Sequence, residues 1–351
     1  MNNNPNFQTN SKKVLTIEDF LKCEVTDNTE INELEPIVTI GGSLFCATNE
    51  MSFISGKPKA GKTSVASVIL STCLTDNPQF DTLGIIGTFC NDRNIIYIDS
   101  EQSLRSSKQI IERVKKNLGL TKKPKNLRVF NFRHLQPTDL RKAFEELLKE
   151  FPDAFLWFLD GISDMVDSVN NEVVAKEIIH FLNNAVEKHN TAMILFLHEN
   201  STSASDKMRG HLGSEAQRKC FATISISKDK CKQIHTIKSV ELREGKNFDD
   251  VLFKFDAETK GMVSITGADY KKAKSELGTD GNDFMNSNYR DLIAIDERVP
   301  RQEYIERIMK LDKCSLSSAK NKIIKILDLN QIIMEKVNNR TFYLKENFNL
   351  P

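Results

Sequence analysis

One octapeptide limits what this chain can fold into more than any other feature. Residues 56–63 read GKPKAGKT and match the pattern GxxxxGK[ST] at every fixed position. An apolar run, residues 51–55, comes before it, and a run with helical periodicity, residues 63–74, follows it. In this strand–loop–helix setting, the two glycines let backbone N–H groups turn inward around phosphate groups at a helix N-terminus. The sequence therefore predicts a phosphate-binding loop within an α/β fold.

The same loop predicts how ATP and Mg²⁺ would be held. The amine of Lys62 can reach the terminal phosphates, and the hydroxyl of Thr63 can ligate the metal ion. The expected nucleotide-binding residues are Gly56, Lys57, Pro58, Lys59, Ala60, Gly61, Lys62, Thr63 and Ser64.

Apolar runs alternate with helical segments over residues 36–268. Nearly continuous apolar strands joined by helical crossovers indicate a parallel sheet covered on both faces, and strands without intervening helices indicate an antiparallel extension. The expected parallel strands are 51–55, 94–99, 127–130, 154–160 and 191–197, the helices between them are 63–74, 104–117, 138–150 and 172–189, and the antiparallel strands are 222–227, 234–240, 251–255 and 262–265.

Two carboxylates follow strands of this expected sheet. Asp160 ends the run FLWFLD, where it can hold Mg²⁺ through its water shell; alternatively, it caps the turn that follows. Glu101 lies just past the strand 94–99 and is the candidate base that polarises the attacking water. A cap on the next helix, made by Ser100 or Glu101, is the alternative for this position. Gly161, not an acid, directly follows Asp160.

These segments resemble the RecA-like ATPases, and within them the RepA and DnaB branch of hexameric helicases. The similarity rests on GKPKAGKTS, YIDSEQS, LWFLDG and LFLHEN, and it covers about residues 36–268. A glutamate just past the strand after the phosphate loop, with no acid directly after the later aspartate, is the RecA-like arrangement. The resemblance implies an ATP-hydrolysing core.

The resemblance also implies a role for His198 and for the segment 199–213. A histidine at this strand tip would sense the γ-phosphate; alternatively, His198 is structural and bonds a nearby carbonyl. The segment would line a central channel, where Lys207 and Arg209 could contact single-stranded DNA. An ordinary solvated loop is the other interpretation of the segment.

Arg243 is the candidate cation that would complete the site of a neighbouring subunit and stabilise transition-state charge. Glu241 stands where the family often has a lysine, which is a departure from the pattern. Alternatively, Arg243 is a surface residue paired with Glu241 or Glu244.

The two ends of the chain differ from the core in composition and in the pattern of apolar residues. Residues 1–35 are polar and predict a flexible arm with one short helix at 17–23. Residues 269–286 are polar and contain Gly and Asp, which favours a linker. Residues 287–351 predict a small winged-helix domain, with helices at 289–296, 301–311 and 316–327 and a hairpin of 331–337 and 341–345.

Positive charge is concentrated in this last domain. The net charge of the chain is +1, which gives no global argument for nucleic-acid binding. Residues 301–345, however, hold ten Lys or Arg and five Asp or Glu. Lys320, Lys322 and Lys325 on the third helix and Arg340 in the hairpin turn would suit contact with double-stranded DNA. Winged helices also bind proteins, so that alternative stays open.

Together, these features predict an ATP-hydrolysing, oligomeric DNA motor or loader, similar to the RepA-like replicative helicases of plasmids and mobile elements. A hexameric ring, single-stranded DNA and replication or mobilisation proteins are the expected partners. The alternative is a nucleotide-switched DNA-binding regulator or recombination mediator that does not unwind DNA. Seven scattered cysteines without a CxxC pair, no signal peptide and no apolar run of about 18 residues predict a cytoplasmic protein without a membrane partner.

Overall fold

The structure is a computed structural model. It describes residues 16–21, 23–29, 34–199, 208, 210–229, 231–277, 289–294, 297–312, 316, 319–320, 322–323, 327, 332–337 and 340–345. The chain divides between Glu35 and Pro36 into two units, which are described separately. In the first unit a short helix, α1 (Ile17–Leu21), lies within the predicted helical segment 17–23.

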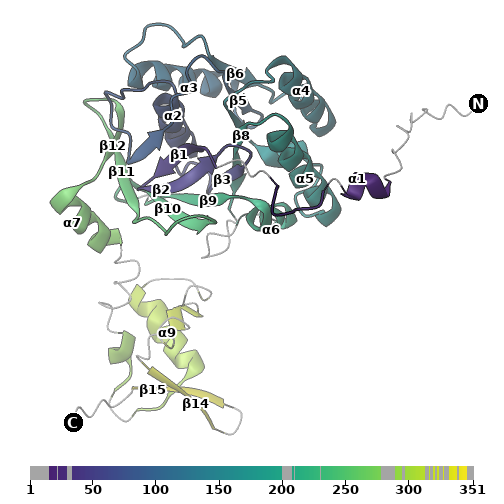
Figure 1. Ribbon diagram of the computed structural model, residues 1–351. Coiled ribbons are helices and arrows are strands. Elements are labelled where there is room, and N and C mark those ends of the chain that lie inside the picture. The colour runs from purple at the N-terminus through teal and green to yellow at the C-terminus, as the bar shows by residue number, and fades with distance from the viewer. Residues whose placement is uncertain are drawn as a thin grey trace, which may run out of the picture. The chain divides into compact units, whose positions relative to one another are not determined.

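The second unit is built on a nine-stranded sheet with the order β12-β11-β10-β9-β3-β8-β7-β5-β6 (Figure 1). The six strands from β9 to β6 are parallel, and β10, β11 and β12 continue the sheet in antiparallel pairs. The prediction of an α/β fold with a large mixed sheet is therefore confirmed. The strands are β3 (Met51–Gly56), β5 (Ile95–Asp99), β6 (Leu127–Asn131), β7 (Leu156–Asp160), β8 (Ala192–His198), β9 (Ala222–Lys228), β10 (Ile234–Leu242), β11 (Val251–Asp256) and β12 (Gly261–Ser264).

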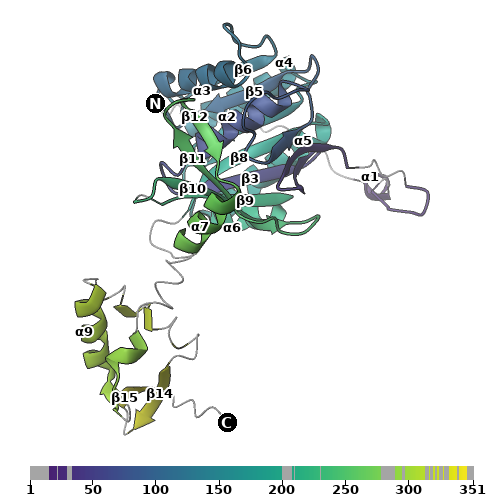
Figure 2. The same cartoon turned by 90° about the vertical axis from the view of Figure 1, so that its left-hand side faces the viewer.

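Helices cover both faces of the parallel part, which is why its strands are apolar on both sides. On one face α4, α5 and α6 pack around Trp157 and Leu195 in one core cluster. On the other face lie α2 and α3, as Figures 1 and 2 show, beside the stacked rings of Tyr97 and Phe158, whose centroids are 5.7 Å apart. The helices are α2 (Lys62–Cys73), α3 (Leu104–Asn117), α4 (Pro137–Glu150), α5 (Glu172–Lys188) and α6 (Gly210–Lys219).

A second, three-stranded sheet was not predicted. It has the order β2-β1-β4 and consists of β1 (Pro36–Ile40), β2 (Ser43–Ala47) and β4 (Ile85–Gly87). Both pairings are antiparallel. The strands are only three to five residues long, and β4 pairs with a strand far away in the sequence. The hairpin of β1 and β2, whose two-residue turn is Gly41 and Gly42 with positive φ, was a local signal that the sequence prediction overlooked.

Two predictions about segments beyond the central strands need correction. The linker expected at 269–286 begins with a helix, α7 (Gly267–Leu277), whose Ala273 is buried against Ile234 and Leu252. Apolar residues spaced three and four apart, Tyr270, Ala273 and Leu277, supply that packing. The polar segment 199–213 is also not a loop at its end, because α6 begins at Gly210. Residues 278–288 lie outside the described part.

The C-terminal residues form a small module with its own core. Its three-stranded sheet has the order β13-β15-β14, and Tyr304, Ile308, Ile323 and Tyr343 are buried together. The predicted hairpin and the helix at 301–311 are present, and described residues between 316 and 327 are helical. The helix predicted at 289–296 is instead a short 3₁₀ helix, η2 (Tyr289–Leu292). The other elements are β13 (Val299–Pro300), α9 (Arg301–Asp312), β14 (Ile332–Val337) and β15 (Arg340–Lys345).

None of the helices in the described ranges combines the length and the apolar character needed to cross a bilayer.

Candidate functional site

The 56–63 loop connects the end of β3 to the start of α2, and residues of β9 and β10 pack against it. A Cβ atom on Gly56 would lie 2.4 Å from the carbonyl oxygen of Ile226 on β9. A Cβ atom on Gly61, where φ is +110°, would lie 2.7 Å from Nδ1 of His235 on β10. The positive φ of residue 61 and its close approach to His235 therefore both require glycine there. The loop borders a cavity of about 490 Å³.

Predicted site residues from four separate elements line this one cavity. Lys62 comes from the start of α2, while Glu101, Asp160 and His198 come from the carboxyl ends of β5, β7 and β8. Because these strands are parallel and adjacent, their ends meet at one edge of the sheet. Of the predicted nucleotide-binding residues, Pro58, Lys59, Ala60, Gly61, Lys62, Thr63 and Ser64 line the cavity.

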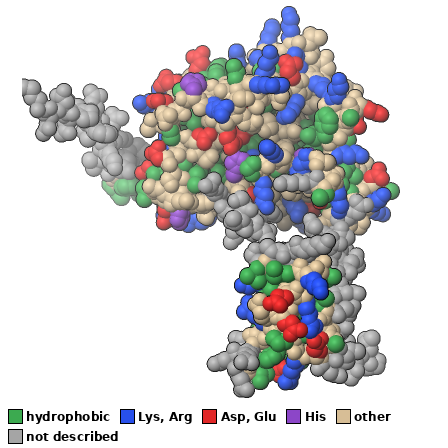
Figure 3. Space-filling model, turned by 180° about the vertical axis from the view of Figure 1, so that it is seen from behind, with side chains coloured by type: hydrophobic (Ala, Val, Ile, Leu, Met, Phe, Trp, Pro, Cys, Tyr) green, Lys and Arg blue, Asp and Glu red, His purple; other side chains and the backbone are tan. Residues whose placement is uncertain are grey.

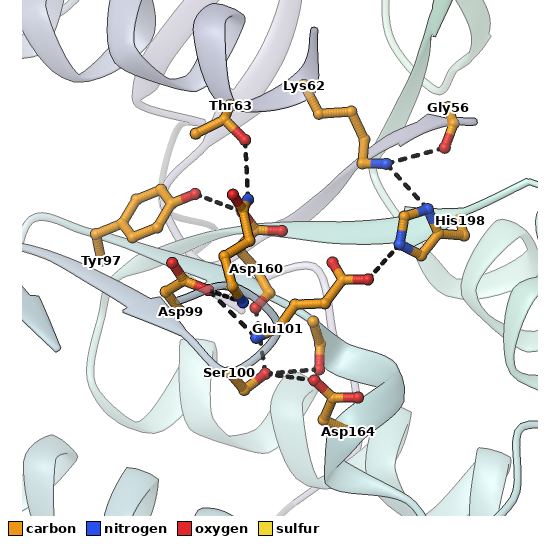
Figure 4. A network of polar contacts seen from close by, with 12 residues as sticks. Gly56, Lys62, Thr63, Tyr97, Asp99, Ser100, Glu101, Asp160, Asp164 and His198 are labelled. Atoms are coloured by element: carbon orange, nitrogen blue, oxygen red, sulfur yellow. Dashed lines mark hydrogen bonds and ion pairs between the residues drawn. The ribbon is translucent and has the colours of Figure 1, made fainter. Parts of the chain in front are cut away.

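A chain of polar contacts joins three of these side chains (Figure 4). Nζ of Lys62 donates to the carbonyl of Gly56 at 2.9 Å and lies 3.2 Å from Nδ1 of His198. An ammonium group has no acceptor, so Nδ1 accepts and the imidazole proton is on Nε2. Nε2 then donates to the carboxylate of Glu101. Among the described residues, His198 thus contacts a cation and a carboxylate, and not the carbonyl of the structural alternative.

Two of these side chains have shifted pKa values. The hydrogen bond from His198 lowers the pKa of Glu101, which keeps that carboxyl ionised to a lower pH. Burial lowers the pKa of Lys62, whose side chain belongs to a residue only 8% exposed. An anion that approaches a desolvated cation of this kind stabilises it.

Asp160 is the second centre of the site. It is 2% exposed, and burial raises its pKa to about 6 even though Tyr97 donates a hydrogen bond to Oδ2 at 2.7 Å. The amide Nε2 of Gln102 lies 3.2 Å from Oγ1 of Thr63 and 3.4 Å from Oδ2 of Asp160. A positively polarised N–H group therefore sits between two oxygen atoms. Hydroxyl and carboxylate oxygens are ligands that Mg²⁺ accepts, so Thr63 and Asp160 fit a hydrated Mg²⁺ ion.

The capping alternatives for the two acids do not hold. Helix α3 is capped by Ser103, whose hydroxyl accepts from N of Ser106. The 3₁₀ helix η1 (Ile162–Met165) begins after Gly161 without a side-chain cap. The side chains of Glu101 and Asp160 are therefore not used as caps. Both point into the cavity instead, together with Lys62 and His198 (Figure 4).

Sequence reasoning missed four residues in or next to this site. Tyr97 and Gln102 lie within the quoted stretch YIDSEQS, and a tyrosine two positions before the strand-terminal aspartate was a usable signal for the first. His235 contacts the 56–63 loop from β10, and a single histidine in a late strand gave no signal. Glu199, which the sequence placed at the start of the polar segment 199–213, is 6% exposed and accepts hydrogen bonds from Ser55 at 2.8 Å and Ser225 at 2.7 Å.

Arg243 is the one predicted catalytic residue that lies apart from the others. Its N–H donates to the carbonyl of Phe221, whose own N–H donates to Met51 at the start of β3. The 56–63 loop begins at the far end of β3, roughly 16 Å away at about 3.3 Å per residue. Arg243 therefore lies at the opposite edge of the sheet from the loop of its own chain, and its guanidinium donates to the carbonyl of Arg218 at 3.1 Å.

The structure does not place all of the side chains that were predicted to contact DNA. Lys207 and Arg209 lie outside the described residues, as does Lys325. Figure 3 shows one face of the molecule, on which Lys and Arg side chains are interspersed with Asp and Glu.

No protein-family model matches this sequence, and a search of curated proteins found no match.

The hydrogen bond between His198 and Glu101 can be tested without any ligand. In a His198→Ala variant, Glu101 loses the donor that lowers its pKa, so its carboxyl should titrate at a higher pH than in the wild type. The measurement is a carboxyl-carbon NMR titration of the nucleotide-free protein, with exposed Glu112 as the internal reference. Equal titration of Glu101 in both proteins would show that the contact has no electrostatic effect.

Proposed function

We propose that this chain is a Mg²⁺-dependent ATPase of the RecA-like P-loop class. The observation that carries the proposal is the convergence of Lys62, Glu101, Asp160 and His198 on one cavity beside the 56–63 loop. These four groups supply the functions that phosphoryl transfer to water needs: a cation for the phosphates, a carboxylate for the metal ion, a carboxylate for the attacking water and a donor near the terminal phosphate.

The proposed mechanism begins with an exchange of partners. The amine of Lys62 leaves the carbonyl of Gly56 for the β- and γ-phosphate oxygens, which lie against the backbone amides of the loop. Thr63 and Asp160 would hold a hydrated Mg²⁺ ion, which would supply charge neutralisation for the phosphates. Gln102 gives up its bridging position between these two residues.

Glu101 then acts on water. Its lowered pKa keeps it ionised, so it can orient a water molecule and accept the proton as the water attacks phosphorus. His198 contacts both Lys62 and Glu101, so a γ-phosphate that attracts Lys62 also changes the environment of the catalytic carboxylate. Hydrolysis and nucleotide sensing would therefore use the same three side chains.

We further propose that the active form is an oligomer that acts on DNA, similar to RepA-like hexameric helicases. Arg243 supports this proposal, since it lies too far from the loop of its own chain to act there but is exposed at the opposite edge, where it can face a neighbouring copy. The C-terminal module supports it as well. Its order of helices followed by a hairpin is that of a winged helix, and Arg301 and Lys320 line a cleft of about 470 Å³.

The test is to measure ATP hydrolysis with and without Mg²⁺ and single-stranded DNA, together with the mass in solution by light scattering. A DNA motor should hydrolyse ATP only with Mg²⁺, turn over faster when single-stranded DNA is added, and have the mass of a ring. Slow turnover that is indifferent to single-stranded DNA, with tight binding of duplex DNA, would instead favour the nucleotide-switched regulator. A protein that binds no nucleotide would end the proposal.

A further inference from the structure

The antiparallel extension of the sheet makes a specific contact with the 56–63 loop through His235. This histidine lies on β10 and is 5% exposed. Its Nδ1 is 2.7 Å from the carbonyl oxygen of Ala60. Its ring stacks on Phe253 of β11, with 4.9 Å between centroids and 19° between the planes. The ring is therefore held between a neighbouring strand and the loop.

The roles in this hydrogen bond follow from the chemistry of its partners. A carbonyl oxygen can only accept, so Nδ1 of His235 carries a proton and donates it to Ala60. Burial lowers the pKa of His235, which favours the neutral ring with its single proton on Nδ1. Ala60 is itself buried, so its carbonyl has little access to water that could replace the histidine.

The contact fixes more than one carbonyl group. The peptide between Ala60 and Gly61 is planar and trans, so its C=O and its N–H point in opposite directions. When His235 holds the carbonyl of Ala60 toward β10, the N–H of Gly61 must point away from β10. Gly61 lines the cavity of the candidate site, and a loop of this kind binds phosphate through inward-pointing N–H groups.

We propose that His235 is a positioning residue that orients the Ala60–Gly61 peptide of the phosphate loop for the nucleotide. This inference rests on the proposed function, because the ligand of the loop is taken to be a nucleoside triphosphate. His235 acts through the loop and not on the reacting atoms. Its removal should therefore weaken nucleotide binding more than it slows turnover at saturation.

Three substitutions separate the hydrogen bond from packing. In His235→Asn the side-chain amide can place an N–H near the position of Nδ1, whereas in His235→Gln the amide reaches the position of Nε2. His235→Phe keeps an aromatic ring against Phe253 but has no donor. His180→Phe, on the exposed side of α5, is the control. A buried carbonyl without a donor should weaken ATP binding by about tenfold in the Gln and Phe variants, while the Asn variant should stay near the wild type.

A second readout does not depend on any nucleotide. Hydrogen exchange of the peptide that covers residues 56–63, measured by mass spectrometry on the nucleotide-free full-length protein, should be faster in the Gln and Phe variants than in the wild type and the Asn variant. Thermal unfolding of each variant shows whether it is folded. If the Phe variant does not fold, the Asn and Gln variants can still be compared with each other, because both carry a side-chain amide.

The outcomes separate the two proposals. Wild-type affinity and wild-type exchange in the Gln and Phe variants would overturn the role of His235 and leave the ATPase proposal intact. An Asn variant as weak as the Gln variant would also overturn it, because the position of the donor would then not matter. If the wild type binds no nucleotide, the function is wrong, but the exchange comparison still decides whether His235 holds the loop.

Discussion

Replacing Lys62 with alanine is expected to reduce ATP hydrolysis by at least about a hundredfold, the usual effect of removing one donor to the transition state. The amine is desolvated and is held by the carbonyl of Gly56 and by His198, on the side of the cavity where Glu101 enters. The loss should appear both in ATP affinity and in turnover.

The measurement compares steady-state hydrolysis and equilibrium ATP binding of the variant with those of a matched control. Lys149→Ala removes an exposed lysine of α4 whose described ion pair is to Glu146 in the same helix, so it should behave like the wild type. Circular dichroism checks that both variants are folded. Hydrolysis by Lys62→Ala at the control rate would place the reaction outside this cavity.

How much of this site the sequence could predict depends on how local each signal is. The 56–63 loop is a contiguous pattern, and the acids Glu101 and Asp160 follow runs of apolar residues that must be buried strands. Parallel strands carry their ends to one edge, so a linear pattern was enough to bring Lys62, Glu101, Asp160 and His198 together. The large mixed sheet followed from the same alternation.

The remaining contacts depend on long-range register, which a single sequence does not contain. His235 meets Ala60 only because β10 pairs with β9 in the register that places His235 opposite Lys228. Glu199 looked like the first residue of a polar loop, yet its carboxylate accepts hydrogen bonds from Ser55 and Ser225, which lie on two other strands of the sheet. The pairing of β4 with β1 and the packing of α7 were missed for a related reason, since their partners lie far away along the chain.

Replacing Asp160 with asparagine should stabilise the nucleotide-free protein at neutral pH while it abolishes the proposed activity. The folded protein raises the pKa of this carboxyl from an ordinary value of 3.8 to about 6, chiefly by burial. Above pH 6 the folded state must therefore hold an ionised carboxylate without water around it. At about 1.36 kcal/mol per pKa unit, this shift corresponds to a cost on the order of 3 kcal/mol in the free energy of unfolding.

The sign of the pH dependence follows from proton binding. Between pH 4 and pH 6 the folded state binds more protons at Asp160 than the unfolded state does, so the contribution to stability is full below about pH 4 and is lost as the pH rises through 6. Asparagine does not titrate. The gain of Asp160→Asn over the wild type should therefore be largest above pH 6 and fall to roughly half at pH 5.

Urea unfolding of the nucleotide-free protein at pH 8 and pH 5 measures this gain. The amide oxygen of asparagine can still accept from Tyr97, so that hydrogen bond is kept, and the attraction between Asp160 and Lys62 is already included in the shift of the Asp160 pKa to about 6. Asp153→Asn, at an exposed position just before β7, controls for the loss of a negative charge.

Mg²⁺-dependent hydrolysis should fall by about a hundredfold or more in Asp160→Asn alone. A variant that is no more stable than the wild type at pH 8 would mean that Asp160 is better solvated than its burial indicates, and full activity would mean that no metal ion depends on it. Greater stability combined with lost activity is what a carboxylate kept for a metal ion should give, because the nucleotide-free fold bears the cost of the charge that Mg²⁺ requires.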